Sequence, residues 1–423
     1  MPGPQRHLTL DHLRRHIAER SLAPSDRGLV GVELELLTYP SDDPGRRAPA
    51  AALRAVAEST GLPARSRITL EPGGQIEIST PPLRGLGEAL PAAAADLGAV
   101  CAALQRAGLK PVARGLDTLR APQRILDQPR YAAMEAFFDA EGFAGRTMMC
   151  STASVQVNVE TGPPGGVAVR WRLAHALGPV LVAMFAHSPV PGGGGRGPRS
   201  ARQQVWSVMD PSRTAPVHRG DAPPTLSPEE EWLRYATAAR VMMIRATPDR
   251  FVPAGAPLGA EVLTFAAWMA RGHELGWPTL DDFEYHLTTL FPPVRPRGWL
   301  ELRMLDSLPD PWWRVAAAVA TALLEDADAG AAALEAVSAP PAGAGVTDHW
   351  RSAARHGLAD PALRAAGQRV FPAALAGLGR LGADRDTVAA AEAFHERFVA
   401  RGRCPADEPA PIPDAEPAEL TWI

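Results

Sequence analysis

The sequence contains one lysine, Lys110, so almost all of its positive charge is arginine. Neither a lysine-dependent P-loop nor a Schiff-base lysine is available unless Lys110 supplies it. Any phosphate group would therefore have to be held by arginine, by a metal ion or by backbone N–H groups.

Cysteine is also scarce: Cys101, Cys150 and Cys404 show no paired spacing of the kind that binds zinc. An odd number of cysteines argues against a disulfide scaffold and indicates a reducing compartment. The N-terminus lacks the apolar run of a signal peptide, and the longest apolar stretch, residues 180–186, is too short to span a bilayer. The net charge is only −4. We therefore expect a cytoplasmic protein that binds neither nucleic acid nor membranes.

The 423 residues are 46% hydrophobic and 21% charged, as in ordinary globular proteins. A chain of this length can form two or three domains, or one large unit with a helical appendage. We expect a catalytic domain over residues 1–310, a helical region over 311–401 that packs on it, and a poorly ordered tail over 402–423, rich in proline and acid.

Two short N-terminal segments place acids at every second residue with aliphatic side chains between them. The first contains Glu33 and Glu35, and the second runs from Glu71 through Gln75 and Glu77 to Ser79. A β-strand has a period of two, so each set of polar residues lies on one strand face. Like charges along a strand repel each other, and a divalent metal ion, alone or with a nucleotide, is the simplest partner for them.

Two further segments alternate in the same way. Residues 148–160 carry Ser154, Gln156 and Asn158 on one face and valines on the other, and residues 299–305 carry Glu301 and Arg303 on one face. Four such strands predict an α+β fold in which a curved antiparallel sheet surrounds a polar cavity and helices cover its aliphatic face. A half-solvated antiparallel sheet is the alternative.

The remaining pattern is mainly helical. We expect helices near residues 8–22, 46–60, 85–108, 127–139 and 168–187, and a helical region over 312–400. The glycine-rich segment 191–198 lacks the strand and the Gly-Lys-Ser/Thr sequence of a P-loop, so we interpret it as a mobile surface loop that could cover a site.

The candidate ligands are oxygen atoms of carboxylates and amides, which favour Mg²⁺ or Mn²⁺ over zinc or copper. Arg303 would lie beside the metal and suits a phosphoryl oxygen, although a structural Glu–Arg pair is the alternative. Arg202 is a second candidate for anion binding, or simply part of an exposed helix start. His286 either contacts substrate or metal or is buried and hydrogen-bonded to a loop.

Seven segments of the chain, in this order, resemble the carboxylate–amine ligase family of glutamate–cysteine ligases (family 2), in particular its actinobacterial ergothioneine-pathway branch. They are residues 31–35, 71–79, 148–158, 200–206, 210–214, 286–293 and 299–303. The ordered set, and Glu-Pro-Gly-Gly-Gln-x-Glu above all, makes the resemblance specific.

The resemblance implies a fold similar to glutamine synthetase, with an antiparallel sheet curved into a funnel. It also implies assignments for the site residues. Metal binding falls to Glu33, Glu35, Glu71, Glu77, Gln156 and Glu301; phosphate and nucleotide binding to Arg202, Arg303, Gln156 and Asn158; substrate binding to Gln75, Ser79 and His286; and catalysis to Arg303, Glu301 and Arg202.

The activity implied by the resemblance is ATP- and Mg²⁺-dependent ligation of the glutamate γ-carboxylate to the cysteine amine, through a γ-glutamyl phosphate. ATP, glutamate and cysteine are then the small-molecule partners. Three alternatives stay open: a ligase of the same fold acting on another acid or amine, a non-catalytic binding homologue, and a metal-dependent nuclease or phosphatase.

Overall fold

The computed structural model describes residues 8–190, 197–219, 226–254, 262–337 and 346–408. Its centre is an antiparallel sheet with the strand order β2-β3-β1-β6-β10-β9, and β4 and β5 also pair with β1. A separate hairpin joins β7 to β8. The strands are β1 (Leu29–Pro40), β2 (Arg67–Leu70), β3 (Ile76–Ser79), β4 (Leu83–Arg84), β5 (Leu109–Val112), β6 (Ser154–Val159), β7 (Met243–Thr247), β8 (Arg250–Pro253), β9 (Val294–Pro296) and β10 (Leu300–Asp306).

Helices lie on both sides of this sheet. Those of the N-terminal and middle parts are α1 (Leu10–His16), η1 (Ile17–Ser21), α2 (Ala50–Ser59), α3 (Gly85–Arg106), α4 (Pro129–Asp139), α5 (Ala144–Ser151), α6 (Val167–Phe185), α7 (Ala201–Ser207), α8 (Pro211–Thr214), α9 (Pro228–Ala238), α10 (Phe265–Arg271) and α11 (Leu280–Leu287). The C-terminal ones are α12 (Trp312–Glu325), α13 (Ala327–Val337), α14 (Val346–His356), η2 (Gly357–Ala359), α15 (Pro361–Leu378), α16 (Arg385–Arg397), η3 (Val399–Arg401) and η4 (Pro405–Asp407).

The aliphatic face of the sheet is buried against helices. Val32 and Leu34 of β1, Val157 of β6 and Leu302 of β10 belong to the largest hydrophobic cluster of the described chain. Helix α3 packs on β1 and β5, α6 on β10, and α12 on β6. Helix α12 is apolar on nearly all sides because it lies between the sheet and the outer helices α15 and α16.

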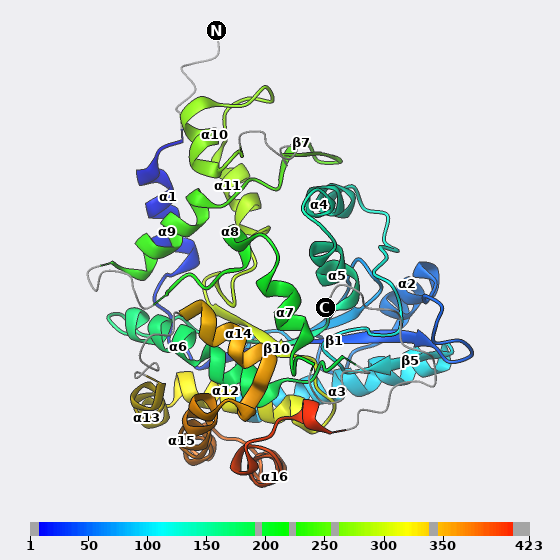
Figure 1. Ribbon diagram of the computed structural model, residues 1–423, viewed down its shortest axis with the longest axis vertical. Helices are drawn as coiled ribbons and strands as arrows, with labels where there is room; N and C mark the ends of the chain where they lie inside the picture. The colour runs from blue at the N-terminus through cyan, green and yellow to red at the C-terminus, as the bar shows by residue number, and fades with distance from the viewer. Residues whose placement is uncertain (1–7, 191–196, 220–225, 255–261, 338–345, 409–423) are drawn as a thin grey trace.

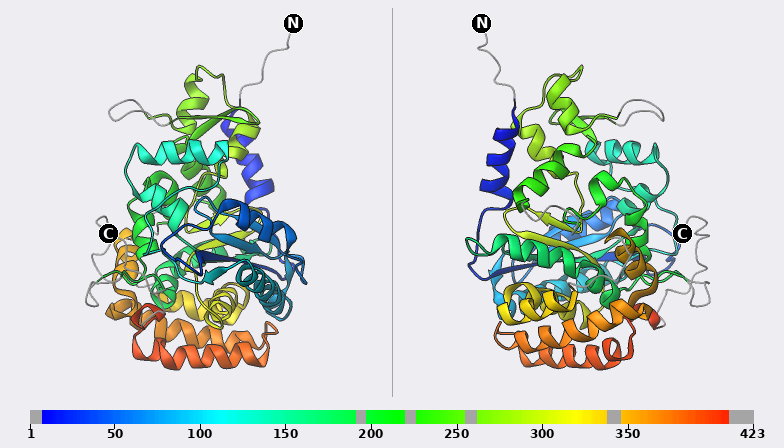
Figure 2. Two further views of the ribbon diagram at one scale, coloured as in Figure 1. Left: turned by 90° about the vertical axis from the view of Figure 1, so that its right-hand side faces the viewer. Right: turned by 60° about the vertical axis from the view of Figure 1, so that its left-hand side comes forward.

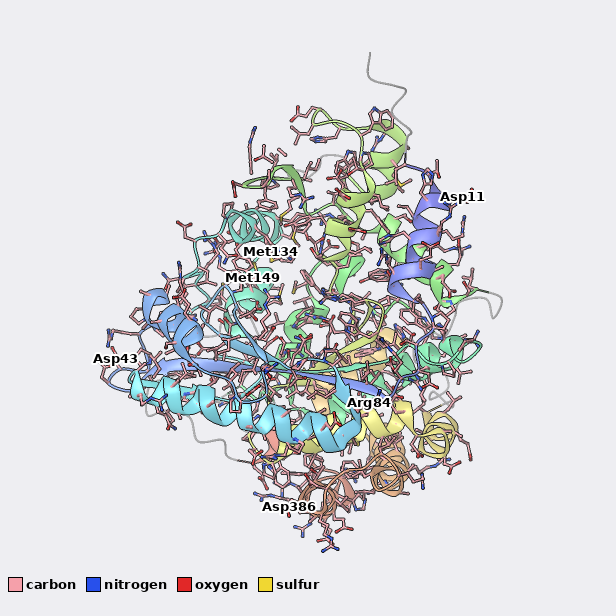
Figure 3. All side chains as sticks on the ribbon, turned by 180° about the vertical axis from the view of Figure 1, so that it is seen from behind. Asp11, Asp43, Arg84, Met134, Met149 and Asp386 are labelled. Atoms are coloured by element: carbon pink, nitrogen blue, oxygen red, sulfur yellow. The ribbon has the colours of Figure 1, made fainter. Side chains whose placement is uncertain are left out.

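The result is a layered molecule in which the sheet separates two groups of helices (Figures 1 and 2). Helices α12, α13, α15 and α16 lie below the sheet in Figure 1, and α4, α5, α7, α8, α10 and α11 rise above it. Seen from behind, Met134 and Met149 lie above the sheet, whereas Asp386 lies among the C-terminal helices below it (Figure 3). The polar face of the sheet therefore looks toward the upper group.

The predicted α+β class, the four alternating strands and the helical C-terminal region are confirmed. One boundary differs. Residues 148–151 were expected to begin the third alternating strand, but they end helix α5, and β6 starts only at Ser154. The alternation of polar and apolar residues begins only at Ser154. The end of helix α5 is fixed by Gln75, whose Nε2 group donates to the carbonyl oxygens of Met149 and Thr152.

The predicted C-terminal tail also differs in part. Residues 402–408 are packed on the body: Cys404 is fully buried, and the Ala406 N–H donates to the Ala186 carbonyl oxygen at 2.9 Å. The expectation of poor order is therefore wrong for this stretch. Residues 409–423, and residues 191–196 of the glycine-rich loop, lie outside the described residues.

Two helices of the described chain, α3 and α6, are long and apolar enough to cross a membrane by length and composition alone. Buried core helices meet the same criterion. In α6, 72% of the most apolar window is buried, and α3 packs on β1 and β5.

The turn between β2 and β3 depends on close backbone packing. A Cβ atom on Gly73 would lie 2.0 Å from the Cys150 carbonyl oxygen, and Gly74 has φ +90°. This turn fixes Glu71 on one side and Gln75 on the other, because the Glu71 N–H donates to the Gln75 carbonyl oxygen at 2.9 Å. The turn therefore couples helix α5 to the polar face of the sheet.

We predict that Gly73→Ala lowers the free energy of unfolding by roughly 2–3 kcal/mol, because the Cys150 backbone must move to admit the methyl group. Chemical denaturation measures this. The control is Gly98→Ala on the exposed side of α3, where no atom lies within 4 Å of an added Cβ and where alanine should stabilise the helix by about 0.5–1 kcal/mol. Equal stability of the two variants would contradict the packing argument.

Candidate active site

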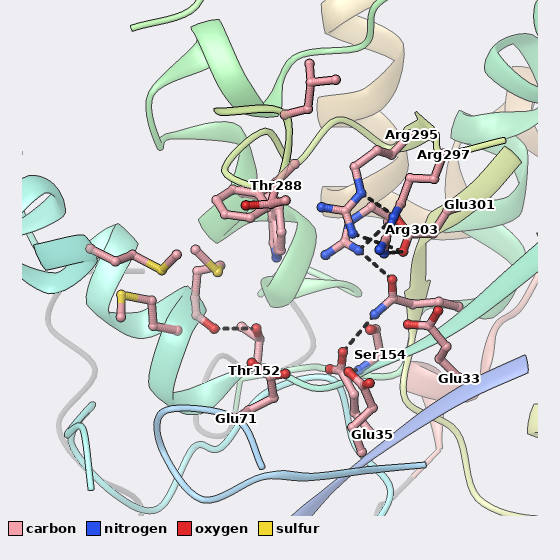
Figure 4. Close-up of a pocket in the computed structure, with 18 of the residues that line it drawn as sticks. Glu33, Glu35, Glu71, Thr152, Ser154, Thr288, Arg295, Arg297, Glu301 and Arg303 are labelled. Carbon is pink, nitrogen blue, oxygen red and sulfur yellow. Dashed lines mark hydrogen bonds and ion pairs between the residues drawn. The ribbon is translucent and has the colours of Figure 1, made fainter. Parts of the chain in front are cut away.

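A cavity of about 660 Å³ opens on the polar face of the sheet. Strands β1, β3, β6 and β10 supply its floor, and the β9–β10 hairpin and helices α4, α5, α7 and α11 supply its walls (Figure 4). One wall is apolar, formed by Met134, Met148, Met149, Trp206 and Phe291. The other walls carry charge of both signs, arranged in two halves.

The acidic half consists of four glutamates. Glu33 and Glu35 project from β1, Glu77 projects from β3, and Glu71 precedes the glycine turn. In the register of the sheet, Glu35 lies directly opposite Glu77. The period-two pattern of the sequence thus brings carboxylates of two strands side by side.

Burial raises the pKa values of all four carboxyl groups, and repulsion from neighbouring carboxylates adds to the rise for Glu33, Glu71 and Glu77. Burial, with repulsion from Glu301 and Glu77, raises the pKa of Glu33 to about 7. Burial and then the neighbouring carboxylates raise the pKa of Glu71 well above its usual range, and the same causes raise that of Glu77. The pKa of Glu35 is raised by burial, although Arg202 and Arg303 oppose the rise.

The two acids of β1 are oriented by neutral donors of β6. Asn158 Nδ2 donates to Glu33 Oε1 at 2.8 Å, and Gln156 Nε2 donates to Glu35 Oε1 at 2.9 Å. The Ser154 N–H donates to Glu35 Oε2 at 2.8 Å. These bonds hold the two carboxylates in place. Because the donors are neutral, they do not compensate the negative charge of the carboxylates.

Glu77 is held in a similar way within its own part of the sheet. The hydroxyl groups of Ser79 and Thr69 donate to Glu77 Oε1 at 2.8 and 2.9 Å. Gln75, in contrast, points its amide toward the backbone of the α5–β6 segment. Gln75 thus supports the shape of the site through the backbone.

The basic half surrounds Glu301. Arg295 binds both carboxylate oxygens of Glu301, with Nη2 at 3.0 Å from Oε1 and Nε at 2.5 Å from Oε2. Arg303 Nη1 lies 3.2 Å from Oε2, and Arg297 Nη1 lies 3.4 Å from Oε1. Burial alone would raise the pKa of Glu301, but these guanidinium groups hold it well below its usual range.

Arg303 connects the two halves. Its Nη1 group also donates to Gln156 Oε1 at 2.6 Å, so the same amide joins Glu35 to Arg303. Burial alone would lower the pKa of Arg303, but Glu301, Glu33 and Glu35 outweigh that effect and raise it. Arg303 therefore stays charged inside the cavity.

Arg202 reaches the same point from helix α7 and is 2% exposed. Its Nη2 group donates to the Arg303 carbonyl oxygen at 2.8 Å, and its guanidinium lies 5.4 Å from the centre of the Trp206 ring. Its Nε and Nη1 groups find no hydrogen-bond acceptor within the described residues. Buried cationic donors without acceptors are suited to an anionic ligand.

The acidic half suits a hard divalent cation. It offers carboxylate oxygens in excess of direct positive partners, and a cation would offset the burial and the repulsion that raise the pKa values of these carboxyl groups. In the part of the chain that the structure describes, no three His, Cys, Asp or Glu side chains already form a compact metal-binding group. The carboxylates would therefore shift toward the ion, as oxygen sites for Mg²⁺ completed by water and phosphate allow.

The structure brings together most of the residues predicted from the sequence. The cavity is lined by Glu33, Glu35, Glu71, Gln75, Glu77, Gln156, Arg202, Glu301 and Arg303. Ser79 and Asn158 stand behind this lining and orient Glu77 and Glu33.

His286 is not among the lining residues. Its Nε2 atom is 2.9 Å from the Ala236 carbonyl oxygen, its ring stacks on Phe265, and burial lowers its pKa to about 3. This geometry fits the alternative of a buried histidine, although the hydrogen-bond partner is a carbonyl of helix α9 and not of a loop.

Two arginines of the basic half were missed by sequence reasoning. Arg295 and Arg297 both line the cavity and both pair with Glu301. Their spacing of two in the segment Val-Arg-Pro-Arg, just before an alternating strand, is the signal that places them on one face. Proline beside them obscured the strand, since proline is uncommon in sheets.

A solved structure shares this fold. The chain aligns with the crystal structure of a bifunctional glutathione synthetase from Pasteurella multocida at a TM-score of 0.50 and 14% sequence identity. The alignment covers 90% of this chain and 49% of the other, so this chain spans about half the length of that protein.

Curated relatives match more closely in sequence. The chain is 42% identical to glutamate–cysteine ligase EgtA of Mycolicibacterium smegmatis, over 96% of this chain and 92% of the relative. It is 40% identical to glutamate–cysteine ligase EgtA of Mycobacterium tuberculosis, over 93% and 88%. A chloroplastic glutamate–cysteine ligase of Medicago truncatula is 30% identical over 60% of this chain and 49% of its own length.

The model of one protein family, described as glutamate–cysteine ligase family 2, matches residues 29–412. That range contains the whole sheet, both charged halves of the cavity and the C-terminal helices as far as the structure describes them. The chain therefore belongs to glutamate–cysteine ligase family 2.

Proposed function

We propose that this protein joins the γ-carboxylate of glutamate to the amine of cysteine at the expense of ATP, forming γ-glutamylcysteine. The observation that carries the proposal is one cavity in which four half-buried carboxylates face a cluster of arginines. Its relatives at 40–42% identity are named glutamate–cysteine ligases, which gives the acid and the amine.

The reaction has two steps. An oxygen of the glutamate γ-carboxylate attacks the γ-phosphorus of ATP, and ADP leaves. The cysteine amine then attacks the acyl carbon, loses a proton, and inorganic phosphate departs with the oxygen that came from the carboxylate. Both steps need stabilised negative charge and aligned reactants, and no nucleophilic side chain is required.

Glu33, Glu35, Glu71 and Glu77 are the residues that would hold Mg²⁺, and Mn²⁺ suits the same oxygens. When bound, the metal supplies the positive charge that phosphate oxygens need. Gln156 and Glu301 currently face Arg303. We assign them to the metal once the triphosphate has drawn the arginines toward its own oxygens.

The arginines receive the phosphates. Arg202 offers two donors that lack acceptors among the described residues, and Arg303 offers its Nε. Arg295 and Arg297 extend this surface along the β9–β10 hairpin. Once they contact the triphosphate, these positive groups would stabilise the transferred phosphoryl group and the later tetrahedral intermediate.

The remaining parts have supporting roles in this proposal. Residues 1–310 carry the chemistry, and residues 311–401 support the floor, because α12 packs directly on β6. The apolar wall limits water near the acyl phosphate. The three cysteines are free, in keeping with a reducing cytoplasm, where ATP and reduced cysteine are both available.

The direct test is ADP release measured with ATP, Mg²⁺, glutamate and a panel of amines. We expect release that depends on glutamate, with kcat/KM for cysteine above that for serine, alanine and 2-aminobutyrate. A preference for another amine would leave a ligase with a different acceptor. No glutamate-dependent ADP with any amine would overturn the proposal.

Two variants assign the activity to this cavity. Arg303→Ala should lower kcat by roughly 10²–10³, as the loss of one fixed donor to a developing charge does. Arg54→Ala, on an exposed position of α2, is the control and should match the parent protein.

The pKa shifts predict how Mg²⁺ stabilises the protein. The pKa of Glu33 rises from 4.5 to about 7, which corresponds to about 3 kcal/mol of unfavourable interaction for its ionised form. The metal-free fold therefore loses stability as pH rises from about 4.5 through 7, and a cation that binds the ionised carboxylates restores it. Thermal unfolding with Mg²⁺ and with EDTA, at matched ionic strength, should differ more at pH 8 than at pH 6.

Glu77→Gln is the matched variant for that measurement. Removal of one repelling charge should raise the unfolding midpoint in EDTA at pH 8, and the gain from Mg²⁺ should shrink. A Mg²⁺ effect of equal size at both pH values, or one untouched by Glu77→Gln, would contradict the assignment of the acidic half to metal.

A further inference from the structure

A second carboxylate at the end of β10 stands behind the cavity and belongs to neither charged half. Asp306 is 1% exposed and is not among the cavity-lining residues. It follows an irregularity in the β6–β10 pairing between Leu302 and Leu305. Its oxygens accept hydrogen bonds from two segments outside the sheet.

The first segment follows helix α6. The His187 N–H donates to Asp306 Oδ2 at 2.8 Å, and the Ser188 hydroxyl donates to the same oxygen at 2.7 Å. The second segment begins helix α7, where the Ser200 hydroxyl donates to Asp306 Oδ1 at 2.9 Å. One buried carboxylate therefore ties the last residue of β10 to both segments.

Each serine passes this constraint on to the first turn of α7. Ser200 is the N-cap, and its Oγ accepts from the Gln203 N–H at 3.2 Å. Ser188 Oγ accepts from the Arg202 N–H at 3.1 Å. A hydroxyl has a single hydrogen, so donation to Asp306 leaves the lone pairs of each serine for these backbone groups.

The side chain of Arg202 is directed by the same group. Its Nη1 lies 4.0 Å from Asp306 Oδ1, and its Nη2 donates to the Arg303 carbonyl oxygen. In addition, Gln203 Nε2 donates to the Met304 carbonyl oxygen at 2.9 Å, which fixes α7 to β10 a second time. Arg202 thus lies at 2% exposure, and its Nε and Nη1 groups have no hydrogen-bond acceptor among the described residues.

We propose that Asp306 is a positioning residue: through Ser188 and Ser200 it fixes the start of α7 and aims the Arg202 guanidinium at the phosphates of ATP. The inference rests on the proposed ligase function. Asp306 itself touches no reacting atom. Its space is closely defined, because a Cβ on the adjacent Gly115 would lie 2.7 Å from the Asp306 Cγ.

The test compares Asp306→Asn with Asp96→Asn. Asp96 is fully buried in α3 and accepts the Ala64 and Ser66 N–H groups at 2.8 and 2.9 Å, so it matches Asp306 in burial and in bonding to a neighbouring segment. It does not line the cavity. Thermal unfolding, glutamate-dependent ADP release and calorimetric binding of a non-hydrolysable ATP analogue with Mg²⁺ are measured for both.

We expect both variants to lower the unfolding midpoint. Asp306→Asn should also lower kcat/KM for ATP by roughly 10²-fold and weaken binding of the analogue, whereas Asp96→Asn should change either by less than about threefold. If Asp306→Asn keeps the parent kcat/KM while it loses stability, its role is only structural and the proposal fails.

A double-mutant cycle tests whether the effect passes through Arg202. Once Arg202→Gln has removed the guanidinium, Asp306→Asn should cause little further loss of kcat/KM. If the double variant instead loses kcat/KM by the product of the two single losses, the proposal is overturned, since Asp306 would then act through another group.

Two serine variants keep the test available if Asp306→Asn does not fold. Ser188→Ala and Ser200→Ala each remove one relay, and each should lower kcat/KM for ATP by roughly tenfold without abolishing it. Unchanged kcat/KM in both would also overturn the proposal. Absence of glutamate-dependent ADP release in the parent protein would instead refute the ligase function, while the binding of the analogue would still report on Asp306.

Discussion

Repulsion among four half-buried glutamate carboxylates is the constraint on which the rest of the site depends. Glu33, Glu35, Glu71 and Glu77 share one face of the sheet, and burial raises the pKa of each. A fold that keeps such a cluster gives up stability unless a cation compensates it. The neutral amide and hydroxyl donors around the acids fix the direction of the carboxylates without neutralising them. The negative charge of the cluster is therefore left for a bound cation to compensate.

In the basic half, the repulsion to be compensated is between arginines. Glu301 neutralises part of the charge of the buried Arg295, the half-buried Arg303 and the exposed Arg297, which allows three guanidinium groups to stand close together. The phosphate oxygens of a triphosphate would be additional anionic partners for the arginines, and a metal ion would be the cationic partner of the acids. On the proposed function, the two halves would together hold a metal-bound nucleotide, which transfer of a phosphoryl group to a carboxylate requires.

The sequence predicted those parts of the site that depend on strand periodicity. Alternation put Glu33 and Glu35 on one face of their strand and Glu77 on one face of its own, because side-chain direction in a strand follows from its position. Features set by contacts distant in sequence were not accessible. The end of α5 depends on the amide of Gln75, and residues 402–408 are ordered by packing against the end of α6.

The most direct test of the central claim follows the oxygen atoms. Glutamate labelled with ¹⁸O in its γ-carboxylate is incubated with ATP, Mg²⁺, cysteine and the protein, and the inorganic phosphate is analysed by mass spectrometry. Transfer of the γ-phosphoryl group to the carboxylate predicts one ¹⁸O atom in the phosphate for each ADP released. Unlabelled phosphate, or AMP and pyrophosphate as products, would contradict the account.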